Sequence, residues 1–390
     1  MPTTRRHCGL RLLLTAALAI ALPASSSGGE QPDSGKRKPA AAQKAKPAKK
    51  AAKRRPTYSS KPMAQAKLLC ELPEAWNTPD GMTLLPNGEI ILSVPNFNDK
   101  TSPPVLAKIT KDNKPALFYK LPGHPETGRA GPMGLCVAPG GDLYLADNQN
   151  FHHPDGKSPL LGKSRLVRIV VKDGKPVEMV PVVTGFNVSN AVVVHGGCVY
   201  VTETILEPGS KPLVSGVFRF KLGEEGIELK SPLKDDPHLV ATILTYNEKV
   251  PFGADGATFD GRGNLYIGNF ADGTVHKIVF DKEGRVQSNT LFARAPFMKS
   301  CDGIWYDKRT NRIYVADSLA NAVQIVSLDG SVQTLAQDPD NDGSGGRLDQ
   351  PCEVLVRGSE VIVSNMDFPV PGGVNTKFDK PYTMSVIKLD

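Results

Sequence analysis

Five oxygen-bearing side chains recur at regular intervals along the 390-residue chain, and each could bind a metal ion. They are Asp80, Asn190, Asp255, Asp302 and Glu353. Each stands at the start of a short apolar run, so the five would occupy equivalent places in a repeated unit. Carboxylates held close together repel one another, and burying them is costly. A hard cation such as Ca²⁺, which takes about six to eight oxygen ligands, relieves both penalties. The pattern therefore predicts a site for Ca²⁺ or another divalent cation.

An alternative explanation is local turn chemistry, in which each Asp or Asn satisfies backbone donors at the start of a strand. The sixth equivalent position holds Met133, which supplies no oxygen. Coordination would then be one-sided and would leave room for a substrate. No Cys and His cluster at zinc spacing competes with the oxygen ligands.

Other polar residues are expected to reach the same face as substrate or rim contacts. They are Asn148, Glu203 and Asn269, which end the second strand of their units, and His124, His152 and His153, which lie on loops. One of the histidines could act as a proton shuttle. Exposed loop histidines without a role in the site are the alternative.

A second calcium candidate lies in the segment 338–349. The carboxylates of Asp338, Asp340, Asp342 and Asp349 fall at loop positions 1, 3, 5 and 12, with Gly343 at position 6. This spacing matches an EF-hand loop. It departs from that motif by ending in Asp and by lacking apparent flanking helices. The alternative is an acidic, turn-rich connection between repeats.

These residues belong to a six-fold repeat that organises most of the chain. Counted from Asp80 through Met133 to Glu353, the repeats are spaced by 53, 57, 65, 47 and 51 residues. Each unit holds short β-branched or aromatic runs bounded by turn residues, such as Leu265-Tyr266-Ile267. Units of this length that form four strands are propeller blades. We therefore expect an all-β fold, a six-bladed β-propeller with four-stranded blades.

The sixth unit is one strand short, because only one strand, 384–389, follows its first two. We expect residues 66–72 to supply the missing outer strand, so that an N-terminal strand closes the ring and removes a free edge. In this arrangement the residues that open the innermost strands meet on one face around the axis. That face is where the site should lie.

The N-terminus reads as an export signal, residues 1–27. Arg5 and Arg6 precede an apolar run, Leu10–Leu22, which ends in small residues. We therefore expect an exported protein, periplasmic or secreted, although an uncleaved N-terminal anchor is the alternative.

A basic linker, 28–62, should separate this signal from the propeller, 63–390. Its segment 36–55 carries ten positive charges and no acid, and could hold the protein near an anionic surface or serve only as a solvated spacer. The net charge of +7 comes from this end: residues 1–56 hold 13 Lys and Arg against two acids, which leaves 34 basic and 38 acidic residues in 57–390. We therefore expect no nucleic-acid partner. We also expect the protein to be a monomer.

Two motifs give the repeat a specific resemblance. Residues 301–307, Cys-Asp-Gly-Ile-Trp-Tyr-Asp, and residues 255–260, Asp-Gly-Ala-Thr-Phe-Asp, resemble the family of senescence marker protein, gluconolactonase and luciferin-regenerating enzyme. Extended NHL-type propellers share such short motifs. The resemblance implies an axial divalent metal, often Ca²⁺, and matches its ligands by blade order to Asp80, Asn190, Asp255 and Asp302. A register shifted by one blade would replace Asp80 with Glu353.

The sequence departs from that family in three places. This chain has Asp80 where the family has Glu, and Asp255 where the family has Asn. Both side chains can still bind a metal through oxygen. The family arginine just before Asn190 is absent, since Val188 and Ser189 stand there.

The function that the resemblance implies is metal-dependent hydrolysis of a small lactone or ester, with Asp302 as general base on a water. The alternative is a non-catalytic NHL-like propeller that binds a protein or glycan outside the cytoplasm, because a fold does not imply a function. A propeller with a quinone cofactor is a third and weaker hypothesis.

Overall fold

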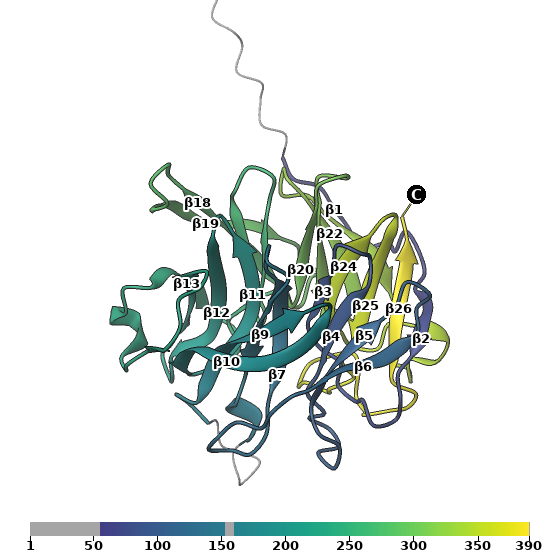
Figure 1. The fold of residues 1–390 in the computed structure, drawn as a ribbon. Coiled ribbons are helices and arrows are strands. Elements are labelled where there is room, and N and C mark those ends of the chain that lie inside the picture. The colour runs from purple at the N-terminus through teal and green to yellow at the C-terminus, as the bar shows by residue number, and fades with distance from the viewer. Residues whose placement is uncertain (1–54, 153–159, 390) are drawn as a thin grey trace, which may run out of the picture. The chain divides into compact units, whose positions relative to one another are not determined.

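A computed structural model describes residues 55–152 and 160–389. Six antiparallel sheets surround an axis as the blades of a β-propeller (Figure 1), which confirms the predicted all-β fold. The four helices in the described residues are short 3₁₀ turns: η1 (Asn150–His152), η2 (Leu233–Asp235), η3 (Ser318–Ala320) and η4 (Ser344–Gly346). No helix in this part of the chain is long and apolar enough to cross a membrane.

Each blade has four strands, named A to D from the axis outward. Blades one and two are β3 (Met82–Leu84), β4 (Ile90–Val94), β5 (Val105–Ile109), β6 (Pro115–Lys120) and β7 (Pro132–Val137), β8 (Leu143–Asp147), β9 (Ser164–Lys172), β10 (Lys175–Phe186). Blades three and four are β11 (Ser189–His195), β12 (Cys198–Glu207), β13 (Leu213–Lys221), β15 (Leu239–Thr245) and β16 (Ala254–Phe259), β17 (Leu265–Asn269), β18 (Thr274–Phe280), β19 (Val286–Arg294). Blade five is β20 (Ile304–Asp307), β21 (Arg312–Asp317), β22 (Ala322–Ser327), β23 (Val332–Gln337), and blade six is β24 (Pro351–Arg357), β25 (Glu360–Asn365), β26 (Thr383–Lys388) with β2 (Lys67–Glu71) outermost.

The ring closes as the sequence predicts. Strand β2 pairs antiparallel with β26, with Lys67 opposite Val386 and Leu68 opposite Ser385. The outer strand of the last blade therefore comes from the N-terminal side of the chain. This strand covers the outer edge of β26, which would otherwise be unpaired.

Two further strands extend the blades. β1 (Tyr58–Ser59) pairs parallel with β23, and β14 (Ile227–Glu228) pairs parallel with β10. The backbone N–H of Val332 donates to the carbonyl of Thr57 at 3.0 Å. The chain is thus held against blade five from Thr57 onward, inside the range assigned to the basic linker. The expected signal segment 1–27 and the linker up to residue 54 lie outside the described residues.

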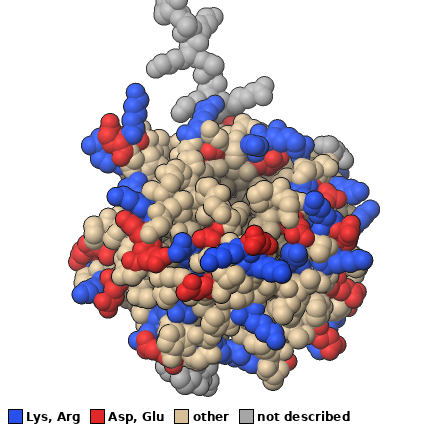
Figure 2. Space-filling model, viewed as in Figure 1, with Lys and Arg blue, Asp and Glu red and all other residues tan. Residues whose placement is uncertain are grey.

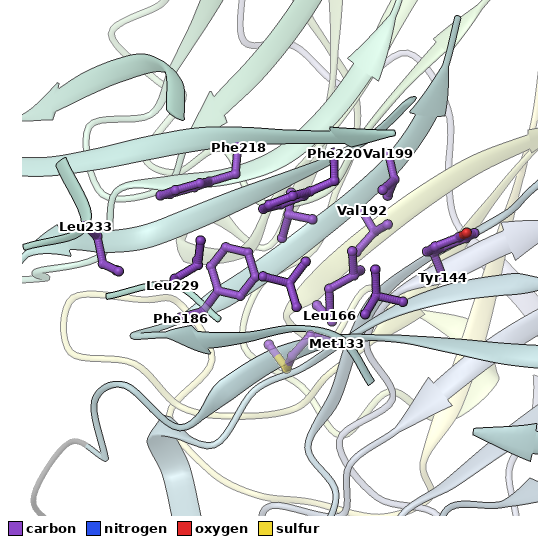
Figure 3. Close-up of a cluster of buried hydrophobic side chains, with 14 of the residues drawn as sticks. Met133, Tyr144, Leu166, Phe186, Val192, Val199, Phe218, Phe220, Leu229 and Leu233 are labelled. Atoms are coloured by element: carbon purple, nitrogen blue, oxygen red, sulfur yellow. The ribbon is translucent and has the colours of Figure 1, made fainter. Parts of the chain in front are cut away.

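The hydrophobic core is divided among the interfaces between neighbouring blades. Buried side chains form one cluster at each interface, and Figure 3 shows the one between blades two and three. There the Phe186 ring meets Phe218 edge-on, with centroids 5.4 Å apart, and Phe218 stacks parallel to Phe220. Full burial of each such side chain contributes about 1.5–3 kcal/mol. On the face shown in Figure 2, acidic and basic side chains are interspersed.

Glycines let the innermost strands come close to one another. Four of the six residues that follow the axial positions are glycine, and a Cβ there would collide with the backbone of the next blade. At Gly256 it would lie 2.2 Å from the carbonyl oxygen of Asp302, and at Gly81 2.6 Å from that of Met133. The Asp-Gly pairs therefore serve the contact between blades, and not only the turn that the sequence suggested.

We predict that Gly256→Ala lowers the free energy of unfolding by at least about 2 kcal/mol, because the new methyl group overlaps backbone that cannot rotate away. Denaturant unfolding measures it. The matched control is Gly140→Ala in an exposed turn, where a Cβ meets nothing within 4 Å. The control should change stability by no more than about 0.5 kcal/mol. Equal effects of the two substitutions would refute the close-approach explanation.

Candidate functional site

The predicted axial residues meet in a small cavity. Asp80, Asn190, Asp255 and Asp302 all line it, together with Met133, and its volume is about 90 Å³. It opens on the face made by the D-to-A and B-to-C loops. Asp80 and Asp255 are buried, whereas Asn190 and Asp302 are partly exposed to the cavity. The oxygens of one amide and three carboxyl groups are thus gathered from blades one, three, four and five.

Irregular strand pairing aims these side chains at the axis. Strand β16 shifts register against β17 between Ala254 and Ala257, at the point where Asp255 leaves the ladder. β11 shifts against β12 between Ser189 and Val192, on either side of Asn190. Bulges of this kind turn a side chain away from the regular alternation of a strand. They explain how a residue of strand A can face along the axis.

Polar side chains at the ends of the B strands hold the segments that lead into the axis. Asp317 accepts hydrogen bonds from the backbone N–H of Ser300 at 2.8 Å and of Lys299 at 3.1 Å, just ahead of the axial residue of blade five. Glu203 does the same in blade three, accepting from Asn187 at 2.7 Å and Val188 at 2.8 Å.

The predicted rim residues Glu203 and Asn269 therefore lie behind the cavity wall. Asn269 accepts a hydrogen bond from the Thr245 hydroxyl at 2.9 Å and donates to the Leu244 carbonyl at 3.0 Å. Neither of them lines the cavity. Both position backbone, so their contribution to the site is indirect.

The three axial carboxyl groups are electrostatically unfavourable as anions. Burial raises the pKa of Asp80 well above its usual range, and the Asp302 carboxylate raises it further. Burial and then Asp80 raise the pKa of Asp255. Burial and then Asp255 raise the pKa of Asp302, against the hydrogen bond that Ser318 Oγ donates to Asp302 Oδ2 at 2.7 Å. Among the described residues no Lys, Arg or His lines the cavity to offset these charges.

Glu353 faces a different opening. It lines a larger pocket of about 580 Å³, which is walled by the same inner strands β7, β11, β16 and β20 nearer the A-to-B hairpins. Its Oε1 accepts the backbone N–H of Val354 at 2.9 Å. Burial raises the pKa of Glu353, and so do Asp302 and Asp80. Glu353 is therefore close enough for electrostatic repulsion by the axial carboxylates, although it does not share their cavity.

The chemistry of the donors fits a hard divalent cation. Three carboxyls and the Asn190 amide supply oxygen only, which suits Ca²⁺ and not a softer metal. The charge they gather is balanced by no side chain of the described cavity wall. No three Asp, Glu, His or Cys side chains of the described chain already converge at ligand spacing. The donor set is suitable in kind although its carboxyls are not at ligand spacing, and water would complete the coordination.

The two predicted histidines that the structure describes, His124 and His152, do not line the cavity. His152 Nε2 lies 3.1 Å from the Ala130 carbonyl oxygen, and burial, with Lys100 and Arg129, lowers its pKa to about 4. His124 is buried, and its Nδ1 accepts the backbone N–H of Glu126 at 3.2 Å. His153 lies outside the described residues.

Asn148, in contrast, lines the cavity as expected. Its Oδ1 accepts the backbone N–H of Asn150 at 2.8 Å, while its Nδ2 is buried without a hydrogen-bond partner. A buried donor left unpaired destabilises a protein unless something binds it. Asn148 therefore brings an unpaired donor to the residues that line the cavity.

Apolar side chains cover the cavity, and the repeat pattern of the sequence does not predict them. They form what we call the aromatic cap, defined as Phe151, Phe252, Phe270 and Phe368, with Met366, Val188 and Val370 beside it. Three of the four rings come from B-to-C loops, whose lengths differ from blade to blade. In the sequence, the cap is indicated only by a Phe in each of these otherwise polar loops.

The acidic loop 338–349 connects β23 to β24, and its carboxylates are engaged within the fold. Asp338 Oδ2 accepts the Leu348 N–H at 2.8 Å, Asp340 accepts from Thr376, and Asp342 pairs with Arg347 at 2.9 Å. The Asn375 amide donates to Asp349 at 2.9 Å, and burial followed by Asp367 raises the pKa of Asp349 to about 8. These contacts suit the turn-rich alternative, and calcium binding here stays a prediction.

The comparisons with known proteins agree on the fold. No protein-family model matches the chain, and no curated protein matches it in sequence. Among solved structures, a gluconolactonase from Xanthomonas campestris aligns at 12% identity and a TM-score of 0.53, over 84% of this chain and 90% of that one. The calcium-binding protein regucalcin from Agrobacterium tumefaciens aligns at 13% identity and 0.54, over 86% and 97%.

The same fold also serves other chemistry. A protein from Thermus thermophilus, provisionally assigned as a glucose dehydrogenase, aligns at 13% identity and a TM-score of 0.53, over 83% and 99%. The chain is thus a six-bladed propeller of the type found in gluconolactonase, luciferin-regenerating enzyme and regucalcin, as its motifs indicated. At these identities the likeness establishes the fold, and the function must be argued from the site.

We predict that the stability of the chelator-treated protein falls as pH rises from about 5 to 8. The axial carboxyls keep their protons in the folded state at pH values where the unfolded chain has lost them, so unfolding releases protons and becomes easier as pH rises. Each such group contributes up to about 1.4 kcal/mol per pH unit. Urea unfolding at several pH values measures the slope.

Asp255→Asn should make that slope shallower, because it removes one of the coupled groups. The control is Asp281→Asn in an exposed turn, where hydrogen bonds from the Arg285 N–H and side chain lower the pKa of Asp281. That carboxylate is ionised in both states above pH 5, so the control should keep the wild-type slope. A slope that Asp255→Asn leaves intact would show that the axial groups do not carry the dependence.

Proposed function

We propose that the protein is a Ca²⁺-dependent hydrolase of small lactones or esters that acts outside the cytoplasm. The observation that carries this proposal is the set of three uncompensated carboxyl groups and one amide in a cavity on the propeller axis. The shared fold with gluconolactonase and with a calcium-binding regucalcin supports it. A cation bound there would balance the charge that the protein itself leaves unpaired.

In this proposal the axial residues have two roles, cation binding and proton transfer. Asp80, Asn190, Asp255 and Asp302 would hold the cation, which when bound polarises a carbonyl and stabilises negative charge on its oxygen. Asp302 would accept a proton from the attacking water, since it is partly exposed to the cavity. The Ser318 hydroxyl, 2.7 Å from Asp302 Oδ2, orients that carboxylate.

A non-catalytic binding propeller is the second candidate. The observation that favours it is the larger pocket of about 580 Å³, which is lined by Trp305, Phe259 and His195. The His195 ring stacks on Phe259 with centroids 4.1 Å apart. Such a surface could hold a partner without any chemistry at the axis.

We predict that Ca²⁺ raises the melting temperature of the chelator-treated full chain, because a ligand that binds only the folded state stabilises it by mass action. Asp255→Asn should reduce this shift by at least half. Asp340→Asn, in the acidic loop 338–349, serves as the control and should keep the full shift. Loss of the shift in Asp340→Asn alone would assign the calcium to the loop, and no shift in any protein would remove the main support for the hydrolase.

We predict further that Asp302→Asn lowers kcat for lactone hydrolysis by at least about 100-fold, the usual contribution of a positioned general base. Hydrolysis of a panel of lactones and aryl esters, followed by proton release, measures it. Glu353→Gln is the comparison, because Glu353 faces the other pocket. Equal losses in the two variants would show that the effect is not specific to the base.

A further inference from the structure

The aromatic cap indicates what kind of molecule the cavity receives. Resting on the proposed function, we propose that the substrate is an apolar lactone or ester with an aromatic or aliphatic body, and not a polyhydroxylated sugar lactone. Its body would lie against the aromatic cap, and its carbonyl group would accept a hydrogen bond from Asn148 Nδ2. Three observations carry this inference: the cap, the scarcity of free polar groups in the wall once the axial ligands of the cation are set apart, and the unpaired Asn148 donor.

The cap is a connected set of rings from separate blades. Phe151, in η1 of blade two, lies 6.4 Å from Phe252, which precedes blade four, and 6.2 Å from Phe368 of blade six. Phe252 meets Phe270 edge-on at 6.2 Å. Phe151, Phe252 and Phe368 stay partly exposed, although each lines the cavity. Partly exposed aromatic rings that converge on a cavity are a surface for an apolar ligand.

Apart from the axial groups that would hold the cation, the polar groups of the wall are mostly engaged. The Thr204 hydroxyl donates to the Ala254 carbonyl at 2.8 Å, and Gln350 Oε1 accepts the backbone N–H of Phe368. Val188 lines the cavity and brings no hydrogen-bonding side chain. The several hydroxyl groups of a sugar lactone would therefore find few partners here, and a site rejects a ligand whose polar groups stay unpaired.

Asn148 supplies the one matched polar contact. Its side chain is fully buried, its Oδ1 is held by the Asn150 N–H, and its Nδ2 has no partner. The side chain is therefore fixed, and its unpaired donor belongs to a residue that lines the cavity. One carbonyl oxygen would satisfy it, so the ligand needs one acceptor at this end and an apolar body at the other.

The cavity is small for such a ligand. Its volume of about 90 Å³ is below the roughly 300 Å³ at the lower end of ordinary ligand pockets. A ring-sized ligand must therefore move rings of the cap. Their side chains are held by contacts with other rings, including Phe378 on the outside, 5.4 Å from Phe368. Side-chain rotation can open such a cap without breaking hydrogen bonds.

Two lactams that resist hydrolysis separate ligand class from catalysis. Binding of 3,4-dihydro-2-quinolinone and of D-glucono-1,5-lactam to the calcium-loaded full chain is measured by titration calorimetry. We expect the quinolinone to bind at least tenfold more tightly. Equal or tighter binding of the sugar lactam, or no binding of either compound, would overturn the proposal.

Hydrolysis of dihydrocoumarin and of D-glucono-1,5-lactone, with and without Ca²⁺, is measured beside it. Calcium-dependent hydrolysis that prefers the sugar lactone would leave the proposed function standing and refute the ligand class. Tight binding of the quinolinone with no hydrolysis of any lactone or ester would leave the ligand class standing and refute the proposed function.

Three variants test the contacts themselves. Phe151→Ala should weaken quinolinone binding at least tenfold, whereas Tyr246→Ala, at an exposed aromatic side chain that does not line the cavity, should change it by less than twofold. Asn148→Asp keeps the oxygen that binds the Asn150 N–H and removes the donor, so it should also weaken binding at least tenfold. Each variant must keep the calcium-induced melting shift, which shows that the fold and the axial site are intact. Equal binding by all three variants and the wild type would overturn the assigned contacts.

Discussion

The contact of backbone with backbone around the axis is the constraint on which the rest of this structure depends. The inner strands approach so closely that four of the six axial steps carry glycine. Hydroxyl groups from the B strands complete the contact: Ser93 donates to the Met133 carbonyl at 2.6 Å, and Ser364 donates to the Asp80 carbonyl at 2.7 Å. Each inner strand is therefore fixed by the next blade. That rigidity is what allows carboxylates from different blades to be held near one another despite their repulsion.

The stability that offsets this repulsion lies elsewhere in the fold. The apolar clusters between blades bury large aromatic and aliphatic side chains, while the axis gathers carboxyl groups whose pKa values burial raises. The two regions are joined by the clamps at the ends of the B strands, such as Asp317 and Glu203. A site that is unfavourable alone is thus kept in place by a core that is not part of it. Functional sites commonly depend on their surroundings in this way.

The repeated part of the molecule could be predicted from the sequence, because each blade repeats the same strands. Two features follow from position in the repeat: the shared cavity of Asp80, Asn190, Asp255 and Asp302, and the closing strand at 66–72. Glu353 shows the limit of that reasoning: equivalent position did not mean equivalent direction, since its side chain faces the opposite pocket. The aromatic cap could not be predicted, because it is built from loops that do not repeat and that meet only in three dimensions.

The pairing of β2 with β26 has a consequence for how the chain folds. Lys67 pairs with Val386 across almost the whole length of the propeller sequence, so this contact is strongly non-local. Non-local contacts of this kind slow the folding of all-β proteins. Blade six is also the blade whose four strands come from two distant segments of the chain, so β2 can separate from β26 while the other blades stay intact. Amide hydrogen exchange in β2 and β26 would therefore report the opening of the ring before the unfolding of any blade formed from one continuous segment.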